Sequence, residues 1–370
     1  MSTVFCPMIH GGLNIDLKHD GRMQYNQCCL STTPLNLMVN DRVDWNNKDF
    51  EQIRNINRTE QWLPGCWQCE NLEKVGVKSF RLSMIEKFGM ASNLTGPQRI
   101  DLLFDRSCNL ACRTCGPHSS TLWIKELKQQ GKFTEYRETS NLDKIKSVLA
   151  ALDLSNLGMI QFCGGETLLG NTYWHAAEYI ASLVPDAKQK LTLGFQTNGT
   201  QSIDPRYFEI IDQFHLVKLM ISIDGIGTRF EYLRWPAVWN QVRDNLLHLR
   251  ETLPSNVMFF VQECTSCLNL WYYQEVQQWL KENFATNREG DAVDHTTQLV
   301  KHDYLNPQNI TWEYYQALDS TIQPALGEQW QENPDQIRMF LKESSELDQI
   351  RGQDWKLSFP DIVDFYSRYL

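Results

Sequence analysis

The chain has 370 residues, of which 42% are hydrophobic and 22% charged, a balance that supports a sizeable core and excludes general disorder. Its formal net charge is −10, which weighs against nucleic acid as the main partner because nucleic-acid binders need a basic face. The sequence has no run of 18 apolar residues and no basic-then-apolar N-terminal signal, so we expect a cytoplasmic protein without a membrane span.

Cysteine placement is the most informative part of the composition. The chain has eleven cysteines, an odd number, and most of them stand in closely spaced groups. In a reducing cytoplasm such groups indicate metal or redox chemistry more often than a disulfide framework. The positions are Cys6, Cys28-Cys29, Cys66-x2-Cys69, Cys108-x3-Cys112-x2-Cys115, Cys163 and Cys264-x2-Cys267.

In chain order, residues 1–85 mix cysteines, turn residues and short apolar stretches, and 86–98 reads as a linker rich in Gly, Ser, Asn and Pro. From residue 99, apolar runs alternate with helical patterns, which predicts βαβ units, a parallel sheet and, with six strands, a partial barrel. Residues 302–370 predict a helical extension. The predicted strands cover 99–104, 158–163, 191–196, 216–223, 257–262 and 297–301, and the predicted helices lie near 118–131, 141–152, 171–184, 206–214, 237–253 and 269–284.

The unusual motifs follow the ends of the first four predicted strands. They are CNLACRTCG, CGGET, QTNG and SIDG, in that order. In parallel α/β folds, sites gather at the carboxyl ends of the strands, so the four motifs predict one shared site.

The loop Cys108-x3-Cys112-x2-Cys115 offers three thiolates and no fourth cysteine. Each thiolate can bind one iron of a cubane, which leaves the fourth iron open to a cofactor or substrate. Two alternatives stay open on spacing alone. One is zinc with His118 as a fourth ligand, and the other is plain core packing of the thiols.

The ordered set of a C-x3-C-x2-C loop, GGE, TNG and SIDG resembles the radical SAM superfamily over about residues 96–300. The resemblance implies a partial (β/α)6 barrel and a [4Fe-4S] cluster whose open iron binds S-adenosyl-L-methionine. It also implies reductive cleavage of that cofactor to a 5′-deoxyadenosyl radical, which abstracts a substrate hydrogen. One departure is Thr114, where the family usually has an aromatic or large apolar residue before the third cysteine.

The same resemblance assigns the cofactor contacts. It implies that the GGE turn receives the methionine amino group, that Ser222 contacts the ribose and that Arg234 neutralises the methionine carboxylate. Turn chemistry or an exposed charge is the ordinary alternative for each residue. Cys163 is expected to be a core thiol, and Gln262 is a weaker pocket candidate. The expected cofactor-binding residues are Gly164, Gly165, Glu166, Asn198, Ser222, Asp224 and Arg234.

The N-terminal cysteines, with the Asp20-Gly21 turn between them, resemble the SPASM/Twitch auxiliary-cluster module. Four thiolates could hold zinc or a cubane, and the family context favours a second, auxiliary [4Fe-4S] cluster. The N-terminal cysteines suffice for only one cluster, which fits the Twitch module better than SPASM. The module usually follows the barrel, whereas here it precedes it. Cys29 competes with Cys28 as a ligand, and Cys264 and Cys267, expected at a helix start, are assigned no ligand role. The expected ligands are Cys6, Cys28, Cys66 and Cys69.

These expectations divide the chain into an iron–sulfur module at 1–95, a radical SAM barrel at 96–301 and a helical extension at 302–370. The chain also resembles Twitch-type radical SAM proteins, including phage-encoded ones. That resemblance implies no substrate. Relatives with an auxiliary-cluster module often modify ribosomally made peptides, so the module suggests peptide modification as the reaction, and we expect a one-electron donor such as flavodoxin or ferredoxin. The alternatives are dehydrogenation of a small molecule and a non-catalytic iron–sulfur or zinc protein.

Overall fold

A curved sheet organises the computed structural model, which describes residues 4–31, 33–74, 78–132, 140–284, 293, 295–300, 303–319, 323–326 and 330–370. Within these residues the sheet has eight strands in the order β10-β9-β8-β7-β6-β5-β1-β2, and every neighbouring pair is parallel except β1–β2. The strands are β1 (Gly12–Leu17), β2 (Met23–Asn26), β5 (Arg99–Leu103), β6 (Met159–Cys163), β7 (Thr192–Thr197), β8 (Leu216–Ser222), β9 (Val257–Thr265) and β10 (His295–Leu299), and β3 (Met38–Val39) pairs separately with β4 (Arg42–Val43).

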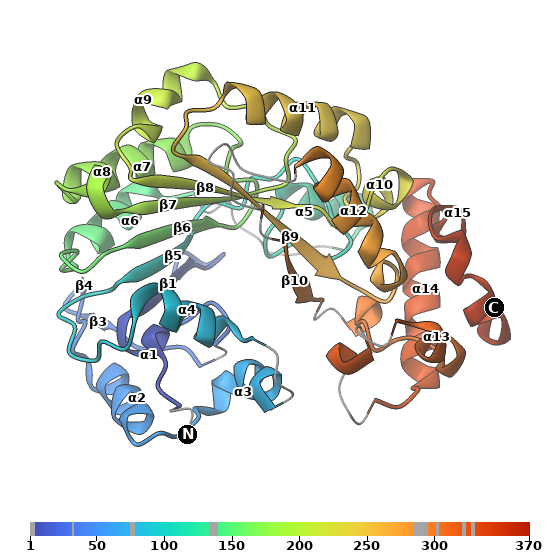
Figure 1. Cartoon of the computed structure of the whole chain (residues 1–370), viewed down its shortest axis with the longest axis horizontal. Coiled ribbons are helices and arrows are strands. Elements are labelled where there is room, and N and C mark those ends of the chain that lie inside the picture. Colours follow the sequence, from blue (N-terminus) through green and yellow to red (C-terminus); the bar gives the residue numbers. More distant parts are fainter. Residues whose placement is uncertain are drawn as a thin grey trace.

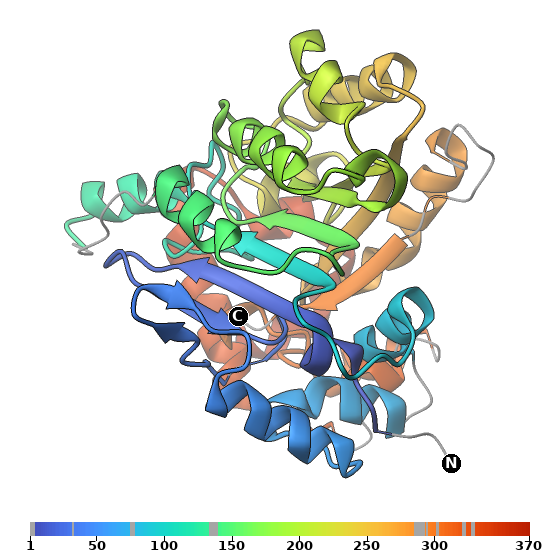
Figure 2. The ribbon, with the colours of Figure 1, turned by 90° about the vertical axis from the view of Figure 1, so that its left-hand side faces the viewer.

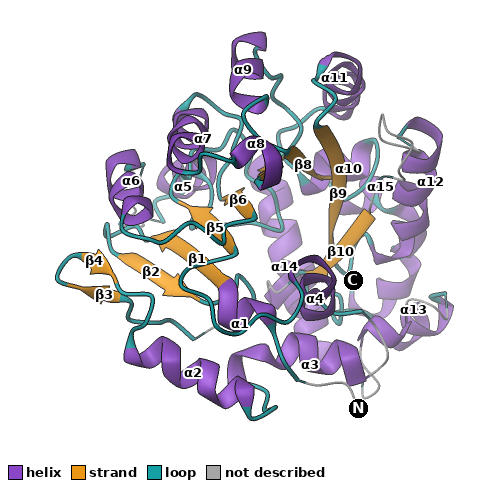
Figure 3. Ribbon diagram, turned by 60° about the vertical axis from the view of Figure 1, so that its left-hand side comes forward, coloured by secondary structure: helices purple, strands orange, loops and turns teal. Residues whose placement is uncertain are grey.

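All six strands predicted from the sequence are present as β5 to β10, so the predicted parallel α/β fold is confirmed. Helices cover the convex face of the sheet (Figures 1 and 3). The convex-facing strand residues, such as Ile100, Phe162 and Leu193, are fully buried in the main hydrophobic core. The α-helices on this part of the chain are α5 (Thr121–Gln129), α6 (Leu142–Ala150), α7 (Thr172–Leu183), α8 (Ala187–Lys190), α9 (Phe208–Ile211), α10 (Thr228–Leu233), α11 (Trp239–Thr252) and α12 (Tyr273–Asn283).

The N-terminal region extends this sheet. The expected hairpin at Asp20-Gly21 is confirmed, because β1 and β2 pair in antiparallel fashion and Gly21 has a φ of +81°. The sequence did not predict that β1 also pairs with β5, in parallel and in register from Gly12 opposite Arg99. Figure 2 shows this hairpin along one edge of the sheet. The helices that follow or precede it are α1 (Pro7–Gly11), α2 (Lys48–Arg58), α3 (Trp67–Lys74) and α4 (Phe80–Phe88), whose last three residues fall in the predicted linker.

The C-terminal region is helical, as expected, and has a core of its own. Trp355, Phe340 and Tyr366 are fully buried there together with Cys267. No helix among the described residues is long and apolar enough to cross a membrane. The helices of this region are α13 (Trp312–Ala317), α14 (Pro334–Arg351) and α15 (Trp355–Ser358).

Two predicted positions need correction. The helix expected at 206–214 is reduced to a 3-10 turn at Pro205–Tyr207 and the four-residue α9. Cys264 lies inside β9 and not at a helix start, because that strand runs three residues beyond its predicted end. The alternation of buried and half-buried residues continues to Thr265, so the strand pattern simply persists.

Candidate functional site

The three-cysteine loop follows β5 and is held by its own backbone. The Leu110 N–H points at the Cys108 Sγ from 3.5 Å, and the Cys115 N–H donates to the Cys112 carbonyl at 3.1 Å. Burial raises the pKa of the Cys108 thiol to about 12 and also raises the pKa of Cys112 and Cys115. Cys112 is buried, and Cys108 and Cys115 are half-buried. The three thiols would therefore ionise readily only beside compensating positive charge, which bound iron would supply.

One such charge belongs to the chain itself. Arg234 is buried, its Nη1 lies 4.0 Å from the Cys112 Sγ, and it acts to lower the pKa of that thiol against the larger effect of burial. The Arg234 Nη2 pairs with the Asp224 carboxylate at 2.8 Å. Asp224 is fully buried and also accepts from the Cys264 N–H at 2.8 Å. The sequence placed Asp224 among the expected cofactor-binding residues and did not foresee that it holds Arg234 beside Cys112.

Backbone bonds fix this arginine to the loop. The Ala111 N–H donates to the Trp235 carbonyl at 2.8 Å, and the Arg113 N–H donates to the Leu233 carbonyl at 2.7 Å. Residues 233–235 therefore run along the cysteine loop as a short two-stranded contact. Asn109, which follows Cys108 in the loop, contacts the TNG motif. Its Oδ1 accepts a hydrogen bond from the Asn198 Nδ2 at 3.0 Å.

The GGE turn packs directly against the start of the loop. Gly165 has a φ of +50°, and a Cβ there would lie 2.4 Å from the Ser107 carbonyl oxygen, so only glycine fits. The Glu166 N–H donates to that same carbonyl at 2.8 Å. Gly164 also has a positive φ, +86°. The two glycines thus allow the turn to approach the cysteine loop as closely as it does.

Glu166 connects two of the predicted motifs. Its carboxylate accepts from the Leu168 N–H at 3.0 Å, the Thr197 hydroxyl at 2.7 Å and the Asn198 N–H at 2.6 Å. The side chain is almost completely buried, and burial raises its pKa. Glu166 therefore joins the turn after β6 to the turn after β7. Thr197, which belongs to the TNG motif but was not among the expected cofactor-binding residues, takes part in this contact.

Replacing Glu166 with Ala should lower the free energy of unfolding by about 3 kcal/mol, because buried donors on Thr197 and Asn198 lose their acceptor. Denaturant unfolding of the metal-free protein measures this change. Glu209→Ala, at an exposed position of α9, is the matched control and should have little effect. Equal stabilities of the two variants would show that the Glu166 contacts do not hold the motifs together.

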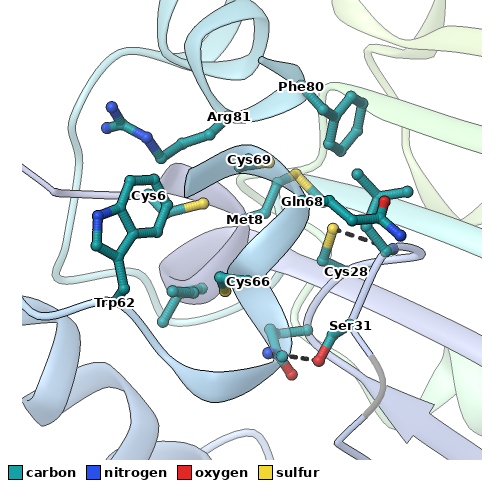
Figure 4. A pocket seen from close by; sticks show the side chains of 14 residues that line it. Cys6, Met8, Cys28, Ser31, Trp62, Cys66, Gln68, Cys69, Phe80 and Arg81 are labelled. Atoms are coloured by element: carbon teal, nitrogen blue, oxygen red, sulfur yellow. Dashed lines mark hydrogen bonds between the residues drawn. The ribbon is translucent and has the colours of Figure 1, made fainter. Parts of the chain in front are cut away.

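A second cysteine site lies in the N-terminal region, where the four expected ligands line a single pocket (Figure 4). Cys6 precedes α1, Cys28 follows β2, Cys66 ends a 3-10 turn and Cys69 lies in α3. Burial raises the pKa of Cys6 to about 12 and that of Cys66 to about 11. The Leu30 N–H points at the Cys28 Sγ from 3.4 Å, and such hydrogen bonds to sulfur are typical of cluster ligands. Trp62, Phe80 and Arg81 also line the pocket.

The structure separates the two members of the Cys28-Cys29 pair. Cys28 lines the four-cysteine pocket, whereas Cys29 does not. Cys29 lies instead within electrostatic reach of Arg99, Asp101 and Cys163, on the strands β5 and β6.

The remaining candidates take different places. Ser222 is buried at the end of β8, in register with Gln262 of β9. Cys264 lies close to the Arg234–Asp224 pair, while Cys267 is buried in the C-terminal core. His118, the alternative zinc ligand, is exposed. In the part of the chain that the structure describes, no three His, Cys, Asp or Glu side chains converge as the ligands of a single metal ion would. A cubane differs in that each thiolate binds its own iron.

Residues 102–262 match the model of the Radical SAM superfamily. The solved structure of anSMEcpe with bound AdoMet aligns with a TM-score of 0.40 and 16% identity over 69% of this chain and 62% of that one. Streptococcus suis SuiB bound to S-adenosylmethionine aligns with a TM-score of 0.39 and 11% identity, over 91% and 69% of the two chains. The alignment thus spans about three fifths of the length of anSMEcpe. No curated protein matches the sequence.

Proposed function

Residues 102–262 belong to the radical SAM superfamily, and from this premise we propose that the chain cleaves S-adenosyl-L-methionine reductively to start a radical reaction on a substrate. The observation that carries the proposal is the convergence of the predicted motifs. The cysteine loop contacts the GGE turn through Ser107, the TNG turn through Asn109 and the segment after SIDG through Ala111. Four motifs from four parallel strands therefore meet at one place.

In this proposal Cys108, Cys112 and Cys115 hold a [4Fe-4S] cluster, and the donor set fits it. Three thiols leave one iron open, the loop directs an N–H at the Cys108 sulfur, and Arg234 offsets negative charge at Cys112. When bound, the cluster and S-adenosyl-L-methionine supply the one-electron cleavage that yields a 5′-deoxyadenosyl radical.

The chain's own residues bind and orient the cofactor. Gly164 and Gly165 bring the backbone of the turn against the start of the cysteine loop, and this backbone is proposed to receive the methionine amino group. Ser222, at the end of β8, is proposed to contact the ribose. Arg234 has five N–H donors, of which the pair with Asp224 uses only part, so the guanidinium retains donors for the methionine carboxylate.

Cys6, Cys28, Cys66 and Cys69 are proposed to hold an auxiliary [4Fe-4S] cluster. Their shared pocket supports this assignment, and four thiolates would leave no iron open for the cofactor. As implied by the sequence resemblance, the proposed substrate is a peptide and the proposed electron donor is a flavodoxin or ferredoxin. Dehydrogenation of a small molecule is the alternative reaction.

The test is made on anaerobically purified protein with a chemical reductant and S-adenosyl-L-methionine. Brown protein that forms 5′-deoxyadenosine is the expected result. Ser222→Ala should raise the Kd of the cofactor roughly fivefold, because one hydrogen bond is worth about 1 kcal/mol. Iron content should not change, and Ser202→Ala, at an exposed position, should leave both quantities unaltered. Colourless protein with stoichiometric zinc and no 5′-deoxyadenosine would contradict the proposal.

A further inference from the structure

Arg113 lies inside the cysteine motif, between Cys112 and Cys115, and its side chain contacts the C-terminal region. It is 1% exposed. Its guanidinium pairs with Asp348 of α14, donates to the Gln353 Oε1 at 3.0 Å and lies 3.7 Å from the centre of the Tyr232 ring. A charge in the middle of the motif is therefore neutralised by a residue 235 positions further along the chain.

A second arginine makes the reverse connection from α14. Arg351 pairs with Glu126 of α5 at 3.1 Å and is almost fully buried. Its guanidinium lies 4.6 Å from the centre of the Trp123 ring and 4.8 Å from that of the Trp235 ring. Both rings belong to residues that hydrogen-bond the cysteine loop, since Trp123 Nε1 donates to the Cys112 carbonyl at 2.8 Å and Trp235 accepts from Ala111.

The Arg113–Asp348 pair connects α14 to the cysteine loop, and the Arg351–Glu126 pair connects α14 to α5, whose Trp123 hydrogen-bonds that loop. Buried charges are costly unless they are paired, so Asp348 stabilises the charge of Arg113, whose side chain is also held by hydrogen bonds to Gln353 and to the Tyr232 carbonyl. Asp348 is itself fixed, because its second oxygen accepts from the Trp355 N–H at 2.9 Å. Figure 1 shows α14 and α15 beside α10, the helix that leads into residues 233–235. The C-terminal region thus contacts the loop directly at Arg113 and indirectly through Trp123 and Trp235.

We propose that α14 is part of the three-cysteine site, with Asp348 and Arg351 as positioning residues for the Cys112–Cys115 span. Asp348 also compensates the charge of Arg113 within that span. The inference rests on the proposed function, because it concerns the cluster that the three cysteines would hold. It adds a role for the helical extension, which no motif in the sequence indicates.

The charge argument makes opposite predictions for the two partners. A positive charge near a cluster favours its more negative, reduced form and so raises the reduction potential. Asp348→Asn leaves Arg113 uncompensated and should raise the potential of the three-cysteine cluster. Arg113→Gln leaves Asp348 uncompensated and should lower it. A purely structural role would not give shifts of opposite sign.

The experiment compares these variants in the full-length protein whose Cys66 and Cys69 are changed to Ala, so that only one cluster is measured. Potentials come from redox titration monitored by EPR, and the rate of iron loss to a chelator is followed by absorbance. We expect iron loss at least threefold faster in each single variant, and a potential close to that of the parent in Arg113→Gln/Asp348→Asn, which removes both charges. Glu346→Gln, at an exposed position of α14, removes one charge from the same helix and should change neither quantity.

Single variants that behave like Glu346→Gln, or that shift the potential in the same direction, would overturn the inference. If the single variants retain too little iron for titration, the double variant decides. Iron retention near that of the parent supports the inference, and loss as rapid as in the single variants overturns it. Absence of iron from the parent, with Cys108, Cys112 and Cys115 intact, would overturn the proposed function and this inference with it.

Discussion

Replacing Cys108, Cys112 and Cys115 together with Ala should abolish reductive cleavage of S-adenosyl-L-methionine. The reason is that no open iron remains to bind the cofactor, while Arg234 and the GGE turn alone supply no electron. The measurement is 5′-deoxyadenosine formed per chain under chemical reduction, quantified by chromatography. We expect the amount of 5′-deoxyadenosine to fall to that formed by the reductant without protein.

Two cysteines outside the motif provide controls for that triple variant. Cys163 lies at the end of β6 and Cys29 follows β2, and neither belongs to the proposed ligand sets. Cys163→Ala and Cys29→Ala should each retain the wild-type iron content. Formation of 5′-deoxyadenosine at the wild-type rate by the triple variant would show that the loop does not hold the catalytic cluster.

The second large effect is expected in the four-cysteine pocket. Wild-type protein should contain about eight irons per chain, and Cys66→Ala/Cys69→Ala about four, because each site would hold one cubane. The remaining EPR signal should respond to added S-adenosyl-L-methionine. In the triple variant of Cys108, Cys112 and Cys115, the remaining EPR signal should not respond to S-adenosyl-L-methionine, since the four thiolates of the pocket would leave no open iron.

Cys28 and Cys29 form a matched pair for the same site. Only Cys28 lines the pocket, so Cys28→Ala should lose the auxiliary iron and Cys29→Ala should keep it. Iron and zinc are both measured by plasma emission spectroscopy. Loss of iron from the Cys29 variant alone would reverse the ligand assignment, and zinc in place of the auxiliary iron would make the pocket a structural zinc site.

The strands of the parallel sheet could be predicted because each one is a short apolar run that is recognisable from a few neighbouring residues. Runs such as 216–223 appear in the structure within one residue of their predicted bounds. Strand β1 is as apolar on its convex face, with Leu13 and Ile15 fully buried, yet its pairing with β5 joins residues almost ninety positions apart. The pattern of residues within one strand does not indicate which distant strand will pair with it.

The candidate site, too, could be predicted only in part from the sequence. Cysteine spacing located both groups of thiols, and the pocket that Cys6, Cys28, Cys66 and Cys69 share was expected. Spacing could not distinguish Cys28 from Cys29, because neighbours on a loop point in directions that only the fold determines. Nor could it reveal that Asp224 pairs with Arg234, since carboxylates at strand ends serve ligands and internal ion pairs equally well.

The position of β1 also bears on solubility. With β1 and β2 in place, β5 is an interior strand of the sheet, and the edge is formed by a four-residue strand that carries polar Gln24 and Asn26. A chain lacking this hairpin would expose the backbone of β5 along Arg99–Leu103, and unprotected edges of this kind template aggregation. Cys6 and Cys28 flank the same hairpin. The segment that carries these two thiols is therefore needed to cover β5, whether or not the four-cysteine pocket holds a metal.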